Sequence, residues 1–528
     1  MKKIMSLFVF VLVLLTLVAC ASKTDVDNPM LDNVTEKDIA DLEDLVNNID
    51  GLYIGLLDNS SITNSTNIEM KSNVITIKSG GTYTVTGTLN DGQIVIDTND
   101  SVIINLSNVS IHNADGAAIY IEDADGFVTI NLMEGTQNTL SDGTSHTDEE
   151  ITGVLYSKDT LIIAGTGTLL IEANYLDGIV SKNSLVIENG IFNISSVGDA
   201  IYGKDDITIN DGTFTIFTGE GSAEAPVIEE IMGGGPGGRP GNPIPSTTTD
   251  EENEGSFKAL KTQGKLTING GTFTIDSYDD SIHSDEDIII NNGTFSIESG
   301  DDAIHANSTL EINGGNINIL YSCEGLEAFS IILNNGYINV YAYDDGLNAT
   351  SGVNTSVGGP GDHPDYSDYD IDSTPSIIIN GGTLIVESDG DGIDANGVVI
   401  INDGQVYICG KGTSLGMIES PIDFDITGIV NGGTVIATGT STMAYEFDNI
   451  DSTQNSFKIT FNKFYSEGTE IVILDTASTT LIKMTVTNSF ETIIFSSDDL
   501  VIGADYKLVI GDDFYNITLN SITTVITS

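Results

Sequence analysis

A repeat of about 22 residues is the feature that most constrains how this chain folds. Between residues 264 and 350 the sequence has four similar turns, and their asparagines are 22, 22 and 21 residues apart. The turns begin at Asn269, Asn291, Asn313 and Asn334, and an acidic segment follows each one. A fixed period this short is typical of a solenoid, in which one coil repeats along an axis.

The residue pattern within each repeat indicates strands. In the segment Thr-Phe-Thr-Ile, Phe273 and Ile275 alternate with polar residues and therefore lie on one face of a strand. Each repeat has two or three such segments, separated by Gly, Asn and Asp. We therefore predict an all-β protein, a right-handed parallel β-helix, because parallel crossover connections are almost always right-handed.

The extent of the repeat divides the chain into segments. We expect a C-terminal β cap, because the end of a solenoid exposes its core and its strand edges. Two insertions interrupt the repeat, and the first is rich in Gly and Pro and cannot form a packed strand. The predicted segments are a lipoprotein signal peptide (1–20), a polar tether with a short helix near 35–47 (21–67), the β-helix (68–447), insertions at 217–256 and 350–375, and the cap (448–528).

The N-terminal segment has the pattern of a secretion signal. Lys2 and Lys3 precede an apolar run from Ile4 to Val18, and the run ends in Leu-Val-Ala-Cys20. This ending resembles the lipobox of bacterial lipoproteins, which implies acylation of Cys20 and display on the extracellular face of the bacterial cell membrane. An ordinary signal peptide or a short membrane span is the alternative.

The charge of the chain limits its partners. With 78 acidic and 18 basic residues the formal net charge is −60, which argues against nucleic acid and points to cations. A solvated acidic surface would also explain the composition, but not acids that recur in register. Cys323 and Cys409 are too few for a disulfide framework and are expected to be unpaired.

Acidic residues recur at two positions of the repeat. Because successive coils of a β-helix stack about 4.8 Å apart, residues at one coil position form a column. The first column is Asp177, Asp199, Glu254, Asp280, Asp302, Glu324, Asp345 and Asp391. The second column, three residues later, is His283, His305, Glu327, Asn348 and Asp394, and it is also assigned Lys258.

Stacked carboxylates require a counter-charge. Two ionised carboxylates about 5 Å apart repel by roughly 3 kcal/mol at an effective dielectric constant near 20. Ca²⁺ relieves this repulsion, because oxygen ligands about 2.3–2.6 Å on either side of one ion nearly span the coil spacing. We therefore predict Ca²⁺ between Glu324 and Asp394, with a solvated acidic face as the alternative.

Several features together resemble a known family. The lipobox, the Gly/Pro-rich insertion, the Asn-Gly-Gly-Thr turns and the Asp-Gly-Ile-x-Ala segments are similar to those of clostridial β-helical carbohydrate-binding proteins, which look like polysaccharide lyases. The resemblance covers roughly Asn67 to the C-terminus. It implies a surface-displayed protein that binds Ca²⁺ and either cellulose or an acidic sugar such as polygalacturonate. It assigns metal roles to Asp279, Asp280, Asp301, Asp302, Glu324, Glu327, Asp344, Asp345, Asn348, Asp391 and Asp394.

Tyrosines beside the acidic segments are candidates for sugar stacking. An anionic sugar would need bound Ca²⁺ as a bridge to so acidic a chain. The chain has no Trp, which weakens the case for a crystalline-cellulose platform. His283 and His305 are further candidates, with a general base, a transition-metal pair or a structural stack as alternatives. The carbohydrate-binding candidates are Tyr278, His283, His305, Tyr321, Tyr341 and Tyr343.

A pectin-active enzyme on the same fold is the competing hypothesis. A pectate lyase commonly uses Arg or Lys as base, but the only arginine is Arg239, inside the first insertion, and Lys258 is the one lysine assigned to the columns. Gly300-Asp301-Asp302 resembles the acidic motif of polygalacturonases, but the accompanying motifs are absent. The sequence therefore favours a binding protein without catalytic residues. A cell-envelope adhesin with no glycan specificity remains a further alternative.

Overall fold

The computed structural model describes residues 51–123, 126–225, 255–351, 373–410 and 420–528. The chain divides into two units, residues 1–215 and 216–528, and each is described by itself. The predicted signal peptide, Cys20 and the predicted helix near 35–47 lie outside the described residues. Within those described ranges, no helix has both the length and the apolar character needed to span a bilayer.

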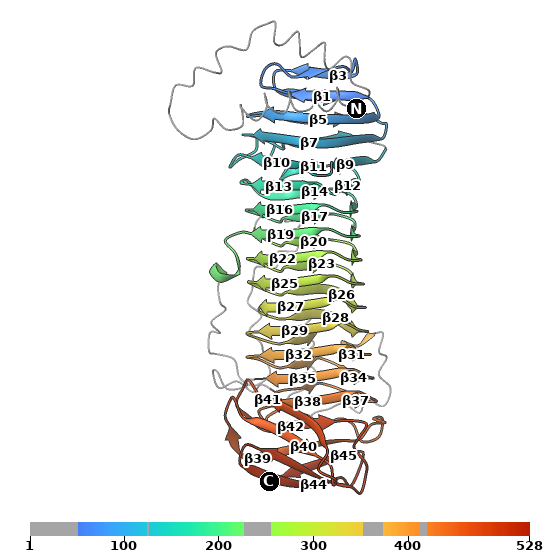
Figure 1. Cartoon of the computed structure of the whole chain (residues 1–528), viewed down its shortest axis with the longest axis vertical. Coiled ribbons are helices and arrows are strands. Elements are labelled where there is room, and N and C mark those ends of the chain that lie inside the picture. The colour runs from blue at the N-terminus through green and yellow to red at the C-terminus, as the bar shows by residue number, and fades with distance from the viewer. Residues whose placement is uncertain (1–50, 124–125, 226–254, 352–372, 411–419) are drawn as a thin grey trace. The chain divides into compact units, whose positions relative to one another are not determined.

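The first unit is a stack of coils whose parallel strands form three columns (Figure 1). One column contains β5 (Gly81–Leu89), β7 (Val102–Asn113), β10 (Gln137–Asp142), β13 (Thr168–Ala173), β16 (Ile191–Ser196) and β19 (Thr213–Thr218). The next contains β4 (Val74–Ile77), β6 (Gln93–Asp97), β8 (Ile119–Asp123), β11 (Gly153–Ser157), β14 (Asp177–Ser181) and β17 (Ile201–Gly203). The last contains β9 (Val128–Leu132), β12 (Leu161–Gly165), β15 (Leu185–Ile187) and β18 (Ile207–Ile209), with β9 paired to the first half of β7.

The stack begins earlier than residue 68. Strand β1 (Leu52–Leu56) pairs in parallel with β5, while β2 (Ile62–Thr63) and β3 (Ile68–Lys71) make antiparallel pairs with β1 and β4. The tether assigned to residues 21–67 is therefore too long at its C-terminal end. Leu52–Leu56 is short and does not show the repeat, so only its pairing with β5 identifies it as part of the stack.

The second unit has the same three-column arrangement (Figure 1). One column contains β22 (Thr272–Ser277), β25 (Thr294–Ser299), β27 (Asn316–Tyr321), β29 (Tyr337–Ala342), β32 (Thr383–Ser388), β35 (Gln405–Gly410) and β38 (Thr434–Gly439). The next contains β20 (Leu260–Thr262), β23 (Ile282–Ser284), β26 (Ile304–Ile312), β28 (Leu326–Leu333), β30 (Leu347–Ala349), β33 (Ile393–Ala395) and β36 (Asp423–Phe424). The last contains β21 (Leu266–Ile268), β24 (Ile288–Ile290), β31 (Ser376–Ile379), β34 (Val398–Ile401) and β37 (Thr427–Val430), and the long strands β26 and β28 also pass through it.

Antiparallel strands end the second unit. Strand β42 (Phe490–Ser496) pairs antiparallel with β38, the last strand of its column, and with β39 (Ser456–Tyr465), whose other neighbour is β45 (Thr523–Thr527). A separate antiparallel sheet has the order β41 (Thr480–Thr485), β40 (Glu470–Leu474), β43 (Asp505–Ile510) and β44 (Asp513–Thr518). These strands lie within the segment predicted to be the cap, and β42 covers the edge of β38 that parallel stacking leaves open.

Apolar side chains stack between coils in the interior. In the second unit Phe273 is paired with Phe295, and their rings lie parallel with centroids 4.7 Å apart. Ile275 and Ile297 pair in the same way, and all four side chains are buried. Burial of each such side chain contributes about 1.5–3 kcal/mol. The alternation seen in the sequence therefore corresponds to one face of each strand packed into the core.

The turn asparagines form a second stack in the second unit. The side-chain Nδ2 of Asn291 donates to Oδ1 of Asn269 at 2.8 Å, and Asn313 donates to Asn291 at 3.0 Å. The glycines that follow hold left-handed backbone conformations, as Gly382 does with φ of 82°. A Cβ there would lie 2.6 Å from the carbonyl oxygen of Gly336, so only glycine fits this turn. The same amide contact continues through Asn334, Asn380, Asn402 and Asn431.

The second insertion leaves the strand register intact, because β28 pairs residue for residue with β31 beyond it. Strand β19 continues through Thr218 and a 3₁₀ turn follows at Ser222–Glu224, so the first insertion begins later than residue 217. The second falls between Ala349, where β30 ends, and Ser376, where β31 begins. Most of each insertion (226–254 and 352–372) lies outside the described residues. The all-β parallel β-helix predicted from the repeat is confirmed within each unit.

Candidate metal and carbohydrate site

The first-column acids of the second unit have a structural role. Asp280 Oδ1 accepts a hydrogen bond from the backbone N–H of Asp302 at 3.2 Å, and Asp302 Oδ1 accepts from the N–H of Glu324 at 3.2 Å. Asp345 Oδ1 accepts from the N–H of Asp391 at 2.8 Å. Each of these carboxylates therefore uses one oxygen to hold the next coil, and this contact by itself explains part of the acidic repeat.

The second-column side chains lie in consecutive coils, as the period predicts. His305 pairs with Glu327, Glu327 with Asn348, and Asn348 with Asp394. The register then continues to Asp423, which pairs with Asp394. The 22-residue period did not predict Asp423 as a member of this column. Its repeat contains the additional residues 411–419, and no Asp-Gly-Ile segment marks its position.

Lys258 supplies a cation at one end of the columns. Its Nζ lies 2.8 Å from Asp279 Oδ1 and 2.7 Å from Asp280 Oδ2. The pairing of Lys261 with His283 places Lys258 at the coil position of Asp280. Its assignment to the second column is therefore wrong: Lys258 stands in the first column. Glu254, assigned to that column, lies outside the described residues.

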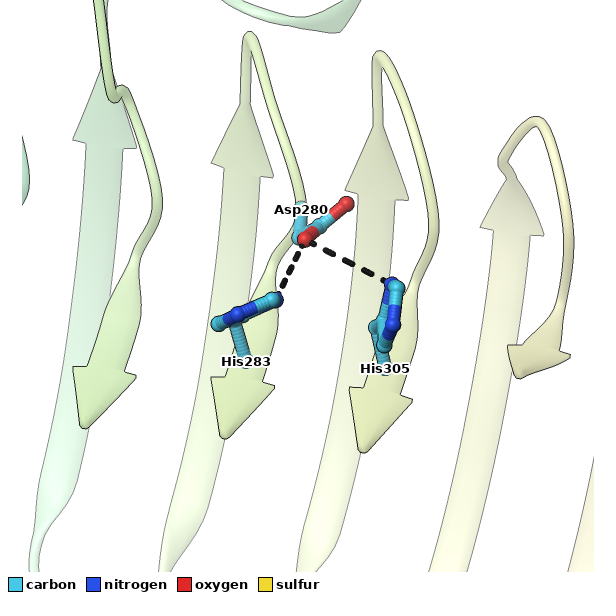
Figure 2. Close-up of side chains that lie close together, drawn as sticks. All are labelled: Asp280, His283 and His305. Atoms are coloured by element: carbon cyan, nitrogen blue, oxygen red, sulfur yellow. Dashed lines mark hydrogen bonds and ion pairs between the residues drawn. The ribbon is translucent and has the colours of Figure 1, made fainter. Parts of the chain in front are cut away.

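The two histidines approach one carboxylate, that of Asp280, from neighbouring strands (Figure 2). His283 Nδ1 lies 2.8 Å from Asp280 Oδ2, and His305 Nδ1 lies 3.9 Å from that oxygen. His305 Nδ1 is also 3.1 Å from Asp302 Oδ2 and 3.7 Å from Glu327 Oε2. The imidazole rings are tilted by 58° to each other, with centroids 4.9 Å apart. They therefore act as counter-charges to the acids around them.

The pKa shifts at this end follow from that compensation. Burial acts to raise the pKa of Asp280, but the Lys258 ammonium and His283 outweigh it and hold the pKa well below its usual range. Burial acts to lower the pKa of His305, but the hydrogen bond with Asp302 and the charge of Asp280 raise it to about 9. Carboxylates and imidazolium ions therefore neutralise one another around Asp280.

The other end of the columns has no such compensation from the described chain. None of the described residues between 306 and 457 is Lys, Arg or His. Burial, together with Asp344, Asp391 and other acids, raises the pKa of Asp345 well above its usual range. Burial and the neighbouring carboxylates likewise raise the pKa of Glu327. A cation bound here would restore these groups to their ionised forms.

Asn348 has a buried oxygen without a hydrogen-bond partner. The residue is only 1% exposed, and its Nδ2 donates to Glu324 Oε2 at 2.7 Å. This contact fixes the orientation of the amide, and the buried Oδ1 has no donor. A buried acceptor without a partner costs about 1–3 kcal/mol, and a cation would remove that cost. Asn348 lies between Glu327 and Asp394 in the strand register.

The donor atoms in this region suit a hard cation. Asp391, Asp394 and Asp423 each offer a carboxylate oxygen within 4.8 Å of the others. Together with Glu327 and Asn348 they provide only oxygen ligands, the set that Ca²⁺ prefers. The residues present therefore fit Ca²⁺ in the kind of ligand atom that they offer.

The predicted metal residues are spread along the stack. They occupy five successive coils, a span of about 19 Å, so one ion cannot contact them all. The structure brings neighbouring coils together and leaves the ends of the set apart. Buried members are Asp280, Asp302, Glu324, Asp345, Asn348 and Asp391; partly exposed members are Asp279, Asp301, Glu327, Asp344 and Asp394.

Three of the four candidate tyrosines gather beside the acidic columns. The ring of Tyr321 lies 5.6 Å from that of Tyr343 and 6.4 Å from that of Tyr341, and all three are partly exposed. Tyr278 packs instead against Phe257, with centroids 5.1 Å apart. Cys323 and Cys409 are free and buried, as predicted.

Comparison with known proteins identifies similar sequences. A family model described as "Carbohydrate-binding domain-containing protein" matches residues 71–226, 213–303 and 288–361, more than half of the chain. A protein of that description from Acetivibrio thermocellus is 33% identical over 144 residues, 26% of this chain. The chain spans about half the length of that curated relative (50%). A solved structure of a polysaccharide lyase-like protein from C. thermocellum, a gadolinium derivative, is 23% identical and covers 51% of this chain and 93% of its own, with a TM-score of 0.35.

In the presence of a metal chelator, we expect the melting temperature of the protein to fall as the pH rises from 6 to 9. Burial and nearby acids raise the pKa of Asp301 to about 8, from about 3.9 when unfolded, so its protonated form favours the folded state below pH 8. His305, raised to about 9, contributes stability below pH 6.5 that is lost as the pH passes 9. Thermal melts at several pH values between 6 and 9 show whether the melting temperature falls or rises with pH. Asp301→Asn should flatten the decrease, whereas the exposed Asp512→Asn should not; a melting temperature that rises with pH contradicts the assignment.

Proposed function

The chain belongs to the carbohydrate-binding domain-containing family, and on this premise we propose that it binds a polysaccharide with the help of Ca²⁺ held on its acidic columns. The observation that carries the metal proposal is Asn348. Its buried Oδ1 has no donor, and it lies in register between Glu327 and Asp394 among described residues that include no basic side chain.

The second column provides the proposed ligands. Glu327, Asn348, Asp394 and Asp423 project from successive coils, and their oxygens would bind ions placed between coils. The first-column acid Asp345 already uses Oδ1 for the N–H of Asp391, so its role is to fix the backbone beside the ions. Bound Ca²⁺ supplies positive charge where the described chain supplies none. Asp279 and Asp280 are excluded from this set, since the Lys258 ammonium already bridges them.

The metal would also determine which sugars bind. A protein with a net charge of −60 repels an anionic polysaccharide, and Ca²⁺ at the surface offers a bridge to its carboxylates. The rings of Tyr321, Tyr341 and Tyr343 lie on neighbouring coils and offer apolar faces against which sugar rings stack. The proposed partner is an acidic, pectin-like polysaccharide such as polygalacturonate, or cellulose.

Calcium should stabilise the folded protein. A ligand at 100 times its Kd stabilises by about 2.7 kcal/mol, so we expect a clear rise in melting temperature with millimolar Ca²⁺. The double variant Asp394→Asn/Asp423→Asn should lose most of this rise, while Asp512→Asn, an exposed acid of the cap, should keep it. Calorimetric titration of chelator-treated protein gives the stoichiometry. No shift in the wild-type melting temperature would contradict the metal proposal.

Binding without catalysis is the expected outcome with polysaccharides. Purified protein should be retained on immobilised polygalacturonate or on cellulose, with retention on polygalacturonate increased by Ca²⁺. Absorbance of unsaturated products and assays for new reducing ends should remain at background. Unsaturated products would instead identify a lyase and new reducing ends a hydrolase. Retention on neither polymer would favour an adhesin without glycan specificity.

The proposal extends to attachment at the membrane. Cys20 ends the apolar N-terminal run, and we place an acyl anchor there that displays the protein on the extracellular face of the bacterial membrane. Cys20→Ser should abolish incorporation of radiolabelled palmitate and release the protein from the membrane fraction. Unchanged labelling of this variant would rule out lipidation at Cys20.

A further inference from the structure

A buried histidine anchors a long connection between two strand columns of the first unit. Residues 143–152 connect β10 to β11, whereas residues 174–176 connect β13 to β14. All residues from 144 to 150 are described, and His146 is the only one of them that is buried. The other side chains of this stretch face solvent, so the position of the connection depends on what holds His146.

Both ring nitrogens of His146 lie against oxygen acceptors. Nε2 lies 3.0 Å from Oδ2 of Asp142, the last residue of β10, and Nδ1 makes a hydrogen bond with the carbonyl oxygen of Ile151, near the end of the connection. The side chains of His146 and Asp142 are both 0% exposed. A neutral imidazole has one N–H donor, so only the imidazolium form donates to both oxygens. The closed connection therefore requires a proton on each ring nitrogen.

Asp142 is itself held by the following coil. Its Oδ1 accepts a hydrogen bond from the backbone N–H of Asn174 at 2.6 Å, and its backbone carbonyl accepts from Nδ2 of Asn174 at 2.9 Å. The ring of Tyr175 packs against that of His146, with centroids 4.5 Å apart. The carboxylate is thus fixed on the side of the next coil. Ile151 belongs to the connection, and its contact with His146 is the one that can give way.

The charged groups around His146 are acids. Burial acts to lower the pKa of His146, but the hydrogen bonds with Asp142 and with the Ile151 carbonyl, together with the charges of Asp142 and Asp115, raise it above its usual value. The acids at 148–150 lie in the connection itself and are exposed, where screening weakens their effect. The surroundings therefore favour the imidazolium form that the two hydrogen bonds require.

We propose that His146 is a pH-sensitive latch, which holds the connection 143–152 closed while both ring nitrogens are protonated and releases it when one proton is lost. The carboxylate of Asp142 holds the Nε2 proton more strongly than a neutral carbonyl holds that of Nδ1, so the Nδ1 proton passes to solvent. A ring lone pair then faces the Ile151 carbonyl oxygen in a buried site, and this contact is unfavourable.

The direction of the switch follows from the two states of the histidine. An unfolded histidine has a pKa of about 6.5, and that of His146 is raised in the folded protein, so the latch is fully closed below about pH 6.5. It opens as the pH rises through the higher pKa of the folded state. This inference concerns the first unit alone and depends on neither the proposed metal nor the proposed carbohydrate binding.

Hydrogen exchange of backbone amides measures the opening of the latch. The amides of Thr147 and Ile151 each donate to a backbone carbonyl, at 2.8 and 3.2 Å, and report on the connection. Exchange is followed by mass spectrometry at several pH values between 6 and 9 in EDTA, with rates corrected for the intrinsic effect of pH, and the peptide of β13 is the internal reference. His146→Gln removes the titrating group. Its control is His112→Gln, which replaces a partly exposed histidine of the same unit.

We expect protection of the connection to fall by about tenfold or more from pH 6 to pH 9 in the wild type and in His112→Gln, with no change in β13. In His146→Gln the protection should not depend on pH. Asp142→Asn removes the charge that favours the imidazolium, so it should move the midpoint of opening to lower pH, by about one unit. Equal protection at pH 6 and pH 9 in the wild type overturns the latch. So does a loss of protection that persists in His146→Gln or, if that variant does not fold, a midpoint unmoved in Asp142→Asn.

Discussion

Hydrogen bonding between parallel strands of successive coils is the constraint on which the rest of this structure depends. It sets each side chain beside its counterpart one coil away, about 4.8 Å along the stack. Where the repeated residue is apolar, the result is attractive, as between Phe273 and Phe295. Where it is an amide, as at Asn269 and Asn291, the side chains bond to one another. Where it is an acid, the same geometry brings like charges together, and the chain must offset them.

The second unit offsets this repulsion in two observed ways, and we propose a third. One oxygen of a first-column acid binds a backbone N–H of the next coil, as Asp280 does with Asp302. Around Asp280 the ammonium of Lys258 and the imidazole of His283 add positive charge. Beyond His305 no described side chain up to residue 457 is basic, and this is the region for which we propose a metal. The proposed ion thus extends a compensation that the chain begins with its own cations.

The first unit shows how the same constraint acts on the opposite charge. There the acids Asp177 and Asp199 keep the structural contact, since the N–H of Asp199 donates to Asp177 Oδ1 at 2.9 Å. Lys158, Lys182 and Lys204 lie one coil apart in that unit, so basic residues recur in register there. A β-helix built from one repeat can therefore hold surfaces of different charge, because the core face fixes the fold and the outward positions are free to vary.

The period by itself determined the fold and the membership of the second column at Glu327, Asn348 and Asp394, because a 22-residue coil fixes which backbone positions are neighbours. The period did not predict the correct neighbours where an insertion or a longer repeat interrupts it. Asp423 follows a lengthened repeat, and Lys258 follows an insertion, so counting residues gave no reliable register for either. Only the tertiary structure decided what each neighbour does: that Asp345 Oδ1 binds a backbone N–H, that Lys258 bridges two carboxylates, and that Asn348 Oδ1 is buried without a donor. The reason is physical. Repetition sets the positions of Cα atoms, but the direction of each side chain and its access to solvent depend on packing by residues outside its own repeat.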